Sequence, residues 1–157
     1  MSAIDPGRRG VSLPEVLVVV AILALGILVT VPLVAERILA ARIRGAAGQY
    51  VVSLRAARMV AVSHNVEVDV IVEPLPANRY RYEDSNGRER TVEMPSGVEI
   101  ASSDSPIRFM PNGSIHANAA AETVLRAEIG GGMLDVYTVT TSVHGIPTVG
   151  HHRQPQE

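Results

Sequence analysis

The chain has 157 residues and a formal net charge of -2, which fits one globular domain and gives no global attraction to nucleic acid. It contains no cysteine, which excludes disulfides and thiolate metal sites. It also lacks tryptophan and has a single phenylalanine, so side chains that stack on single-stranded nucleic acid are scarce. The composition therefore indicates a membrane-anchored soluble domain, once the apolar run near the N-terminus is taken into account.

The N-terminal stretch places a short basic segment ahead of a long apolar run. Arg8, Arg9 and Gly10 come first, and the run extends from residue 16 to residue 35. About 20 apolar residues in a helix cover the hydrocarbon core of a bilayer. Glu15 stands at the start of the run, where a charge inside the membrane costs at least ~2.5 kcal/mol. Glu15 is therefore a functional candidate that needs a partner.

The sequence of basic residues, Gly10, Ser12-Leu13, Glu15 and an apolar helix resembles the class III leader of type IV prepilins and type II secretion pseudopilins. The resemblance implies that residues 1–10 are a leader peptide, which prepilin peptidase cuts between Gly10 and Val11. It also implies that Val11 becomes N-methylated and that the segment beginning there, to residue 35, is a transmembrane and assembly helix. Val11 stands where the family usually has phenylalanine.

Two prolines bear on this helix. Pro14 falls in the first turn, where backbone N–H groups have no intrahelical acceptor, so it removes no helix bond and supports a helix start near Val11. Pro32 lies inside the helix, where it removes one backbone hydrogen bond and is expected to kink or loosen it. Proline also occurs near this position in many pilins.

The expected partner of Glu15 is the α-amino group that cleavage creates on Val11. The amine of the same chain lies one helical turn away, whereas in a filament the amine of a neighbouring subunit replaces it and makes Glu15 a docking signal. An acid that snorkels to the membrane edge is the alternative. Arginines flank both ends of the run, so charge does not choose an orientation. Only the resemblance implies a bacterial inner-membrane protein with a cytoplasmic N-terminus and a periplasmic C-terminal domain.

Residues 36–149 are expected to form a pilin-like globular domain, and residues 150–157 a flexible tail. Apolar residues at helical spacing extend the helix to about residue 63. Beyond it, alternation and turn residues predict strands at 66–72, 79–83, 90–94, 98–101, 107–109, 123–129, 134–140 and 146–149, with a loop at 117–121. The fold class is α+β, with a long N-terminal helix, transmembrane in its first half, packed on a C-terminal antiparallel β domain.

Further elements resemble the type II secretion H and fimbrial T minor pilin family. They are the helix that leads into the first strand, the Phe-x-Pro-x-Gly element at residues 109–113 and the glycine Gly145 near the last strand. The resemblance implies a minor pseudopilin or pilin subunit that is assembled into a type II secretion pseudopilus or a type IV pilus and supports protein secretion. The implied partners are prepilin peptidase, other major and minor pseudopilins or pilins, and the inner membrane.

Two other functions remain open at this point. Some fimbrial T-type pilins bind DNA through basic residues near the C-terminus, and Arg153 is the candidate here, although the expected Gly-Arg-x-Arg pattern is not matched. A competence-type minor pilin that takes up DNA is thus one alternative, and an unprocessed single-pass membrane-anchored domain is the other. The arginines of the helix are expected on a solvated face, or against lipid headgroups or acidic neighbours: Arg37, Arg42, Arg44, Arg55 and Arg58.

An enzymatic function is not expected, and neither a cofactor nor a metal is. A catalytic reading needs Ser142, His144 and Asp135, but their spacing marks no nucleophile turn, and Asp135 is expected to point outward from its strand. The adjacent His151 and His152 lack a third fixed metal ligand.

Overall fold

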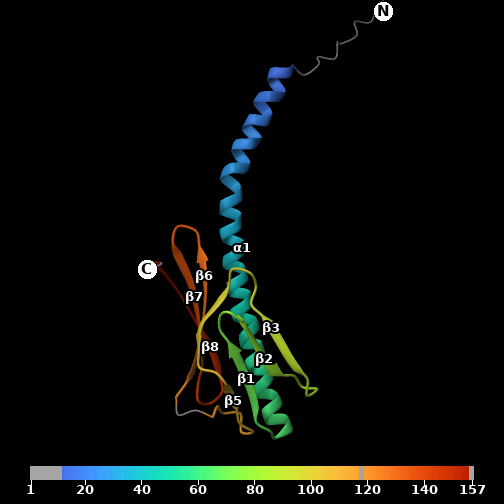
Figure 1. Cartoon of the computed structure of the whole chain (residues 1–157), viewed down its shortest axis with the longest axis vertical. Coiled ribbons are helices and arrows are strands. Elements are labelled where there is room, and N and C mark those ends of the chain that lie inside the picture. Colours follow the sequence, from blue (N-terminus) through green and yellow to red (C-terminus); the bar gives the residue numbers. More distant parts are fainter. Residues whose placement is uncertain (1–11, 117–118, 156–157) are drawn as a thin grey trace, which may run out of the picture. The chain divides into compact units, whose positions relative to one another are not determined.

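The computed structural model describes residues 12–116 and 119–155, with the side chains of residues 27–33 outside the description. One helix, α1 (Leu13–His64), is followed in the described part of the chain by eight strands (Figure 1). The chain divides into two compact units, residues 1–35 and residues 36–157. The expected α+β order of one long helix and then antiparallel strands is confirmed.

The helix α1 begins at a serine cap. The carbonyl oxygen of Ser12 accepts hydrogen bonds from the N–H groups of Glu15 at 3.0 Å and Val16 at 3.2 Å. Pro14 is the second residue of α1, where the missing N–H removes no helix bond. The backbone of α1 continues through position 32, but the side chain of Pro32 lies outside the description, so the kink stays a prediction.

The predicted membrane span, residues 11–35, includes position 11 and the side chains of residues 27–33, which are not described. In the described part of the chain, no helix reaches the length and apolarity that crossing a membrane requires.

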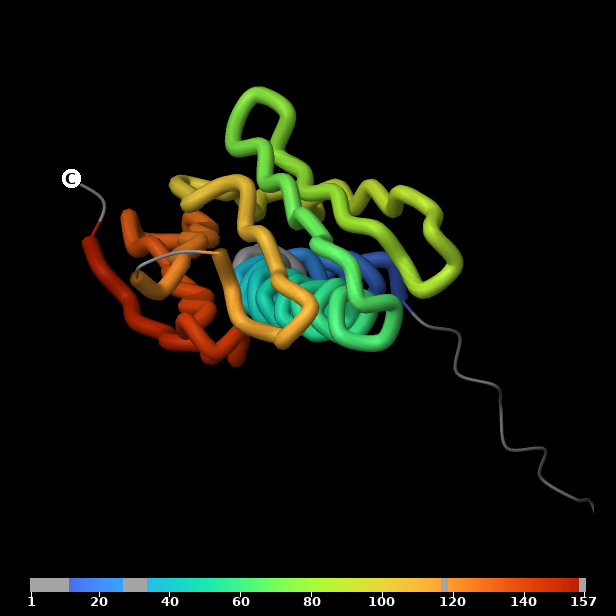
Figure 2. Tube along the Cα trace, turned by 90° about the horizontal axis from the view of Figure 1, so that it is seen from below, coloured from blue at the N-terminus to red at the C-terminus, as the bar shows by residue number. Residues whose placement is uncertain are grey.

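The strands form two four-stranded antiparallel sheets, which Figure 2 shows on different sides of α1. Sheet 1 has the order β3-β2-β1-β5 and sheet 2 the order β4-β6-β7-β8. Sheet 1 consists of β1 (Val68–Glu73), β2 (Arg79–Glu83), β3 (Glu89–Glu93) and β5 (Ile107–Phe109). Sheet 2 consists of β4 (Glu99–Ser103), β6 (Ala121–Ile129), β7 (Met133–Thr141) and β8 (Pro147–Pro155).

Local sequence patterns account for the first hairpins. In β1, Val68, Val70 and Val72 are buried and alternate with half-buried residues, as the period of two predicts. After β2, the carboxylate of Asp84 accepts hydrogen bonds from backbone N–H groups across the turn, and Gly87 takes a positive φ of 71°. The predicted hairpin of β2 and β3 is thereby confirmed, with β3 shifted by one residue from its predicted bounds.

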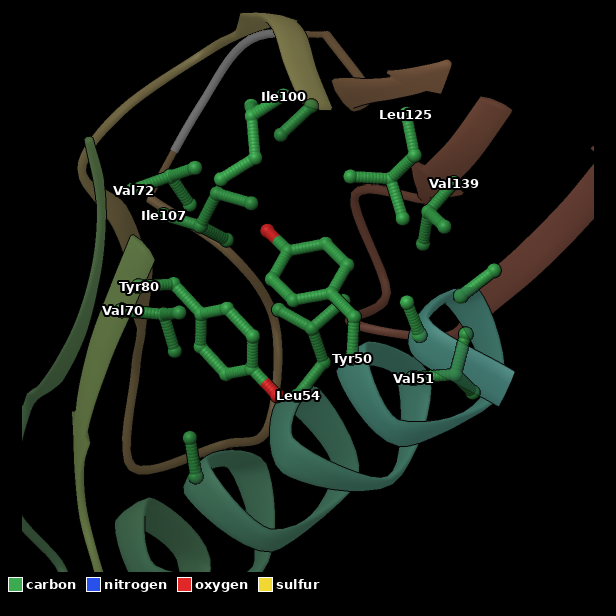
Figure 3. Close-up of a cluster of buried hydrophobic side chains, with 14 of the residues drawn as sticks. Tyr50, Val51, Leu54, Val70, Val72, Tyr80, Ile100, Ile107, Leu125 and Val139 are labelled. Atoms are coloured by element: carbon green, nitrogen blue, oxygen red, sulfur yellow. The ribbon is translucent and has the colours of Figure 1, made fainter. Parts of the chain in front are cut away.

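The core of residues 36–157 lies between α1 and the inner faces of both sheets (Figure 3). The Tyr50 hydroxyl bonds Thr123 Oγ1 on β6 at 3.0 Å, and Ser53 Oγ bonds the Tyr80 hydroxyl on β2 at 3.1 Å. The two tyrosine rings meet edge to face, 4.9 Å apart. Burial raises the pKa of both hydroxyl groups. These hydrogen bonds connect α1 to both sheets.

The prediction of a flexible tail from residue 150 is wrong as far as residue 155. Strand β8 runs from Pro147 to Pro155 and pairs with β7 over its whole length. The prediction failed because only Pro147 of this strand is buried, so its sequence lacks the apolar alternation that marks a half-buried strand. Residues 156–157 lie outside the description, as do residues 117–118 of the predicted loop.

Candidate assembly site and the contacts that support it

The first described turns of α1 expose apolar side chains. Leu13 is 81% exposed, Leu17 64% and Leu25 65%, and the residues between them are exposed as well. Glu15 lies in the first turn, where the partial positive charge of the helix N-terminus favours a carboxylate. An apolar surface of this kind is stable only when another body covers it.

The other predicted residues of this site lie just before it. Gly10 and Val11 are outside the described residues, so the leader peptide, the cleavage between them and the pairing of Glu15 with the Val11 amine stay predictions. The described residues do place Glu15 one turn into a helix whose cap residue, Ser12, immediately follows Val11.

The solvent side of α1 in the second unit is apolar too. We call the residues at its centre the outer stripe: Ile38, Gly45, Gly48, Val52 and Met59. Their spacings of seven, three, four and seven residues place them on one side of the helix, and the three large members are about half exposed or more. A Cβ added at either glycine would meet nothing within 4 Å, so the chain's own fold does not require glycine there. Sequence reasoning found the buried stripe of this helix and missed the exposed one.

Three of the helix arginines have partners within the chain: Arg42 and Arg44 are exposed, as a solvated face requires, and Arg58 is half-buried. Arg58 Nε donates to the Gly113 carbonyl at 2.8 Å, and Arg42 Nη1 donates to Ser96 Oγ at 2.9 Å. The pKa of Arg44 is raised, chiefly by the hydroxyl of Tyr137. A guanidinium reaches loops and strands far along the chain, which helical spacing alone does not reveal.

The contact of Arg58 belongs to a junction of two glycine turns. Gly113 ends the Phe-x-Pro-x-Gly element with a φ of 79°, and Gly145 in the turn before β8 has a φ of 71°. A Cβ on Gly145 would lie 2.1 Å from the Gly113 carbonyl oxygen, so only glycine fits. The backbone also joins the two turns, because Ile115 N–H donates to the Val143 carbonyl at 3.0 Å. Two elements that carry the family resemblance therefore meet in space.

Asp135 is buried on β7, at 1% exposure, and the prediction that it points outward is wrong. It pairs with Ala127 of β6, whose side chain is also buried, and with Arg153 of β8. Asp135 Oδ1 accepts hydrogen bonds from His151 Nε2 at 2.7 Å and from Arg153 Nε at 3.1 Å. Burial acts to raise the pKa of Asp135, but the hydrogen bonds from His151 and Arg153 outweigh it, so the pKa is lowered.

This cluster bears on two of the weaker predictions. Arg153, the DNA-binding candidate, forms an ion pair with Asp135, so its charge is partly compensated within the chain. Asp135 binds His151 rather than His144, and Ser142 Oγ accepts the Ile146 N–H at 3.2 Å. The structure thus gives the Asp135 carboxylate a role in holding β8 against β7.

The prokaryotic N-terminal methylation motif matches residues 5–31. The match spans the predicted cleavage junction, Glu15 and the exposed first turns of α1. The motif indicates a type IV pilin-like, prepilin-type protein, a class that prepilin peptidase processes and that assembles with other pilins. Comparisons of the chain with curated proteins and with solved structures found no match.

Proposed function

We propose that the chain is a minor pilin or pseudopilin subunit of a type II secretion pseudopilus or a type IV pilus, where it supports protein secretion. The leader is removed after Gly10, Val11 is methylated, and residues 11–35 anchor the subunit in the bacterial inner membrane before it enters the filament. The N-terminus is cytoplasmic, and the β domain is periplasmic. The role is structural, without catalysis or a cofactor.

The observation that carries the proposal is the methylation motif placed directly ahead of an exposed apolar helix. The motif covers residues 5–31, and residues 13–26 of α1 are exposed in the single chain. A helix that is apolar on all sides is buried in a membrane or among other helices. The outer stripe is an exposed apolar surface of the second unit, and packing against neighbouring subunits would cover both surfaces.

The proposal includes membership of the type II secretion H and fimbrial T minor pilin family. Its support is the order of elements after the helix, together with the contact between the Phe-x-Pro-x-Gly turn and the turn at Gly145. In this arrangement residues 36–64 of α1 and the strands form one domain, whose exposed strands are free to contact other subunits or cargo.

The proposal is tested by identifying the first residue of the mature chain and by measuring the effect of replacing Glu15. Mass spectrometry of the full chain from its native membrane is expected to find N-methylated Val11 as the first residue, and a Gly10→Glu variant is expected to keep residues 1–10. The Glu15→Ala chain is expected to be processed normally, but its amount in the filament fraction is expected to fall by at least about tenfold. This is the change that ~1.4 kcal/mol of docking energy produces. Val16→Ala is the matched control.

Two results would overturn the proposal. One is a native chain that keeps its first ten residues, which fits an unprocessed membrane-anchored domain. The other is a processed Glu15→Ala chain that enters filaments as well as the Val16→Ala control does, because a carboxylate that is not a docking signal can be removed without loss.

A further inference from the structure

The two sheets have four outer strands, which differ in length and in the regularity of their pairing. Strand β5 is three residues long, and β4 carries a register shift between Ile100 and Ser102. A very short strand and a bulge are two devices by which proteins prevent an edge from pairing with another chain. The other two outer strands, β3 and β8, pair without a register shift over five and nine residues. Figures 1 and 2 place them on opposite sides of α1.

Strand β8 is an ordered edge strand, and burial of its side chains contributes little to the stability of its domain. Of its nine residues only Pro147 is buried, and the clamp of His151 and Arg153 on Asp135 holds it to β7. Prolines stand at its two ends, Pro147 and Pro155, and none lies between them. Alternate residues between positions 148 and 154 therefore direct their backbone donors and acceptors away from β7, where a second strand can pair.

Strand β3 offers a matching edge. Its exposed residues Glu89, Arg90 and Glu93 give β3 a formal net charge of -1, and Arg153 gives β8 a formal net charge of +1, so the two edges have opposite net charge. Within the described residues Glu93 and His152 have no ion-pair partner. Beside β3 lies a hollow of about 250 Å³, lined by residues that include Gly45, Ala46, Tyr80, Val92 and Met94.

We infer that β8 of one copy pairs with β3 of a neighbouring copy and extends sheet 1 by one strand. The five residues of β3 set the length of the contact, a ladder of roughly 17 Å at ~3.4 Å per residue. Because the two edges differ, the contact is head-to-tail and leaves a free β3 at one end and a free β8 at the other, so subunits add in a row. This contact rests on the proposed function and adds to it a direct link between the β domains of assembled subunits.

The absence of cysteine from the chain makes disulfide cross-linking a clean test. Thr91→Cys in the middle of β3 is combined, in the full chain in its membrane, with one cysteine at each position from 148 to 152 in turn. Oxidation is expected to give a ladder of covalent oligomers at one of these positions, the residue that lies opposite Thr91, because residues two positions away on the same face lie about 7–8 Å off, beyond the reach of a disulfide. A mixture of two chains that carry one cysteine each is expected to stop at dimers.

A matched control moves the β3 cysteine to a protected edge. Ala101→Cys on β4, which is also exposed, is expected to give no ladder with the same β8 positions. No ladder with Thr91→Cys, or an equal ladder with Ala101→Cys, would overturn the inference. If the ladder is absent while methylated Val11 is found in filaments, the edge pairing fails and the proposed function stands. If the ladder forms from chains that keep residues 1–10, the edge pairing stands and the proposed function fails.

Discussion

Two parts of α1 have the same kinds of side chain and opposite surroundings. Leu17 is 64% exposed, whereas Leu54 is fully buried against both sheets. Apolar composition therefore does not decide burial; the presence of a covering surface does. The sheets of the same chain cover one side of the second part, whereas the described side chains of the first part are exposed. The proposed anchoring and assembly would cover the first part.

The largest expected difference between the two parts comes from leucine truncation. Leu54→Ala is expected to destabilise the β domain by about 3 kcal/mol, because it leaves a cavity in a closed core, and Leu17→Ala by about zero. The chain has no tryptophan, so the near-ultraviolet circular dichroism of Tyr50 and Tyr80 reports denaturant unfolding of the full chain in detergent. Equal shifts of the unfolding midpoint for the two variants would break the comparison.

A smaller effect of the same kind is expected from two glycines. Gly145→Ala places a Cβ against the Gly113 carbonyl at a positive φ, so we expect a loss of about 2 kcal/mol. Gly48→Ala on the outer stripe meets nothing, and alanine favours a helix, so a gain of about 0.5–1 kcal/mol is expected. The same denaturant titration measures both changes. A loss of stability in Gly48→Ala would mean that the chain itself covers this side of α1.

The smallest effect concerns the strand clamp, the hydrogen bonds from His151 and Arg153 of β8 to Asp135 of β7. Because the pKa of Asp135 is lowered from its usual value of 3.8, the clamp stabilises the fold fully above that pH and is lost as the pH falls through the lower folded value. His151 and Arg153 are partly exposed, so we expect a loss of about 1 kcal/mol between pH 5 and acid, measured by denaturant unfolding. Asp135→Asn is expected to lose less over the same range; an identical pH profile would contradict the clamp.

Much of the fold was accessible to sequence reasoning because its signals are local. The valines of β1 alternate between buried and half-buried positions, and the turn at Asp84 and Gly87 joins β2 to β3 as predicted. The helix was predicted through Tyr50 and Leu54 from their spacing, and both are buried. In each case residues a few positions apart act through backbone geometry that a short stretch of sequence already contains.

The errors fall where distant residues supply the partner. Asp135 looked like a solvated strand residue because its two cationic partners lie sixteen and eighteen residues further along the chain. Arg58 was expected on a solvated face but is half-buried, because its acceptor, the Gly113 carbonyl, lies 55 residues further along the chain. Strand β8 lacked an apolar pattern because it is an exposed edge, whose order comes from the backbone ladder with β7.

The sequence by itself determined the N-terminal methylation motif at residues 5–31, the extent of the long helix beyond Tyr50, and most of the strands, since these depend on residue types and spacings within one segment. Tertiary structure alone decided which side of α1 is covered, which strand edges are regular and free, and why position 145 requires glycine. Those properties depend on contacts between segments far apart in the chain, and only the packed domain brings the segments together.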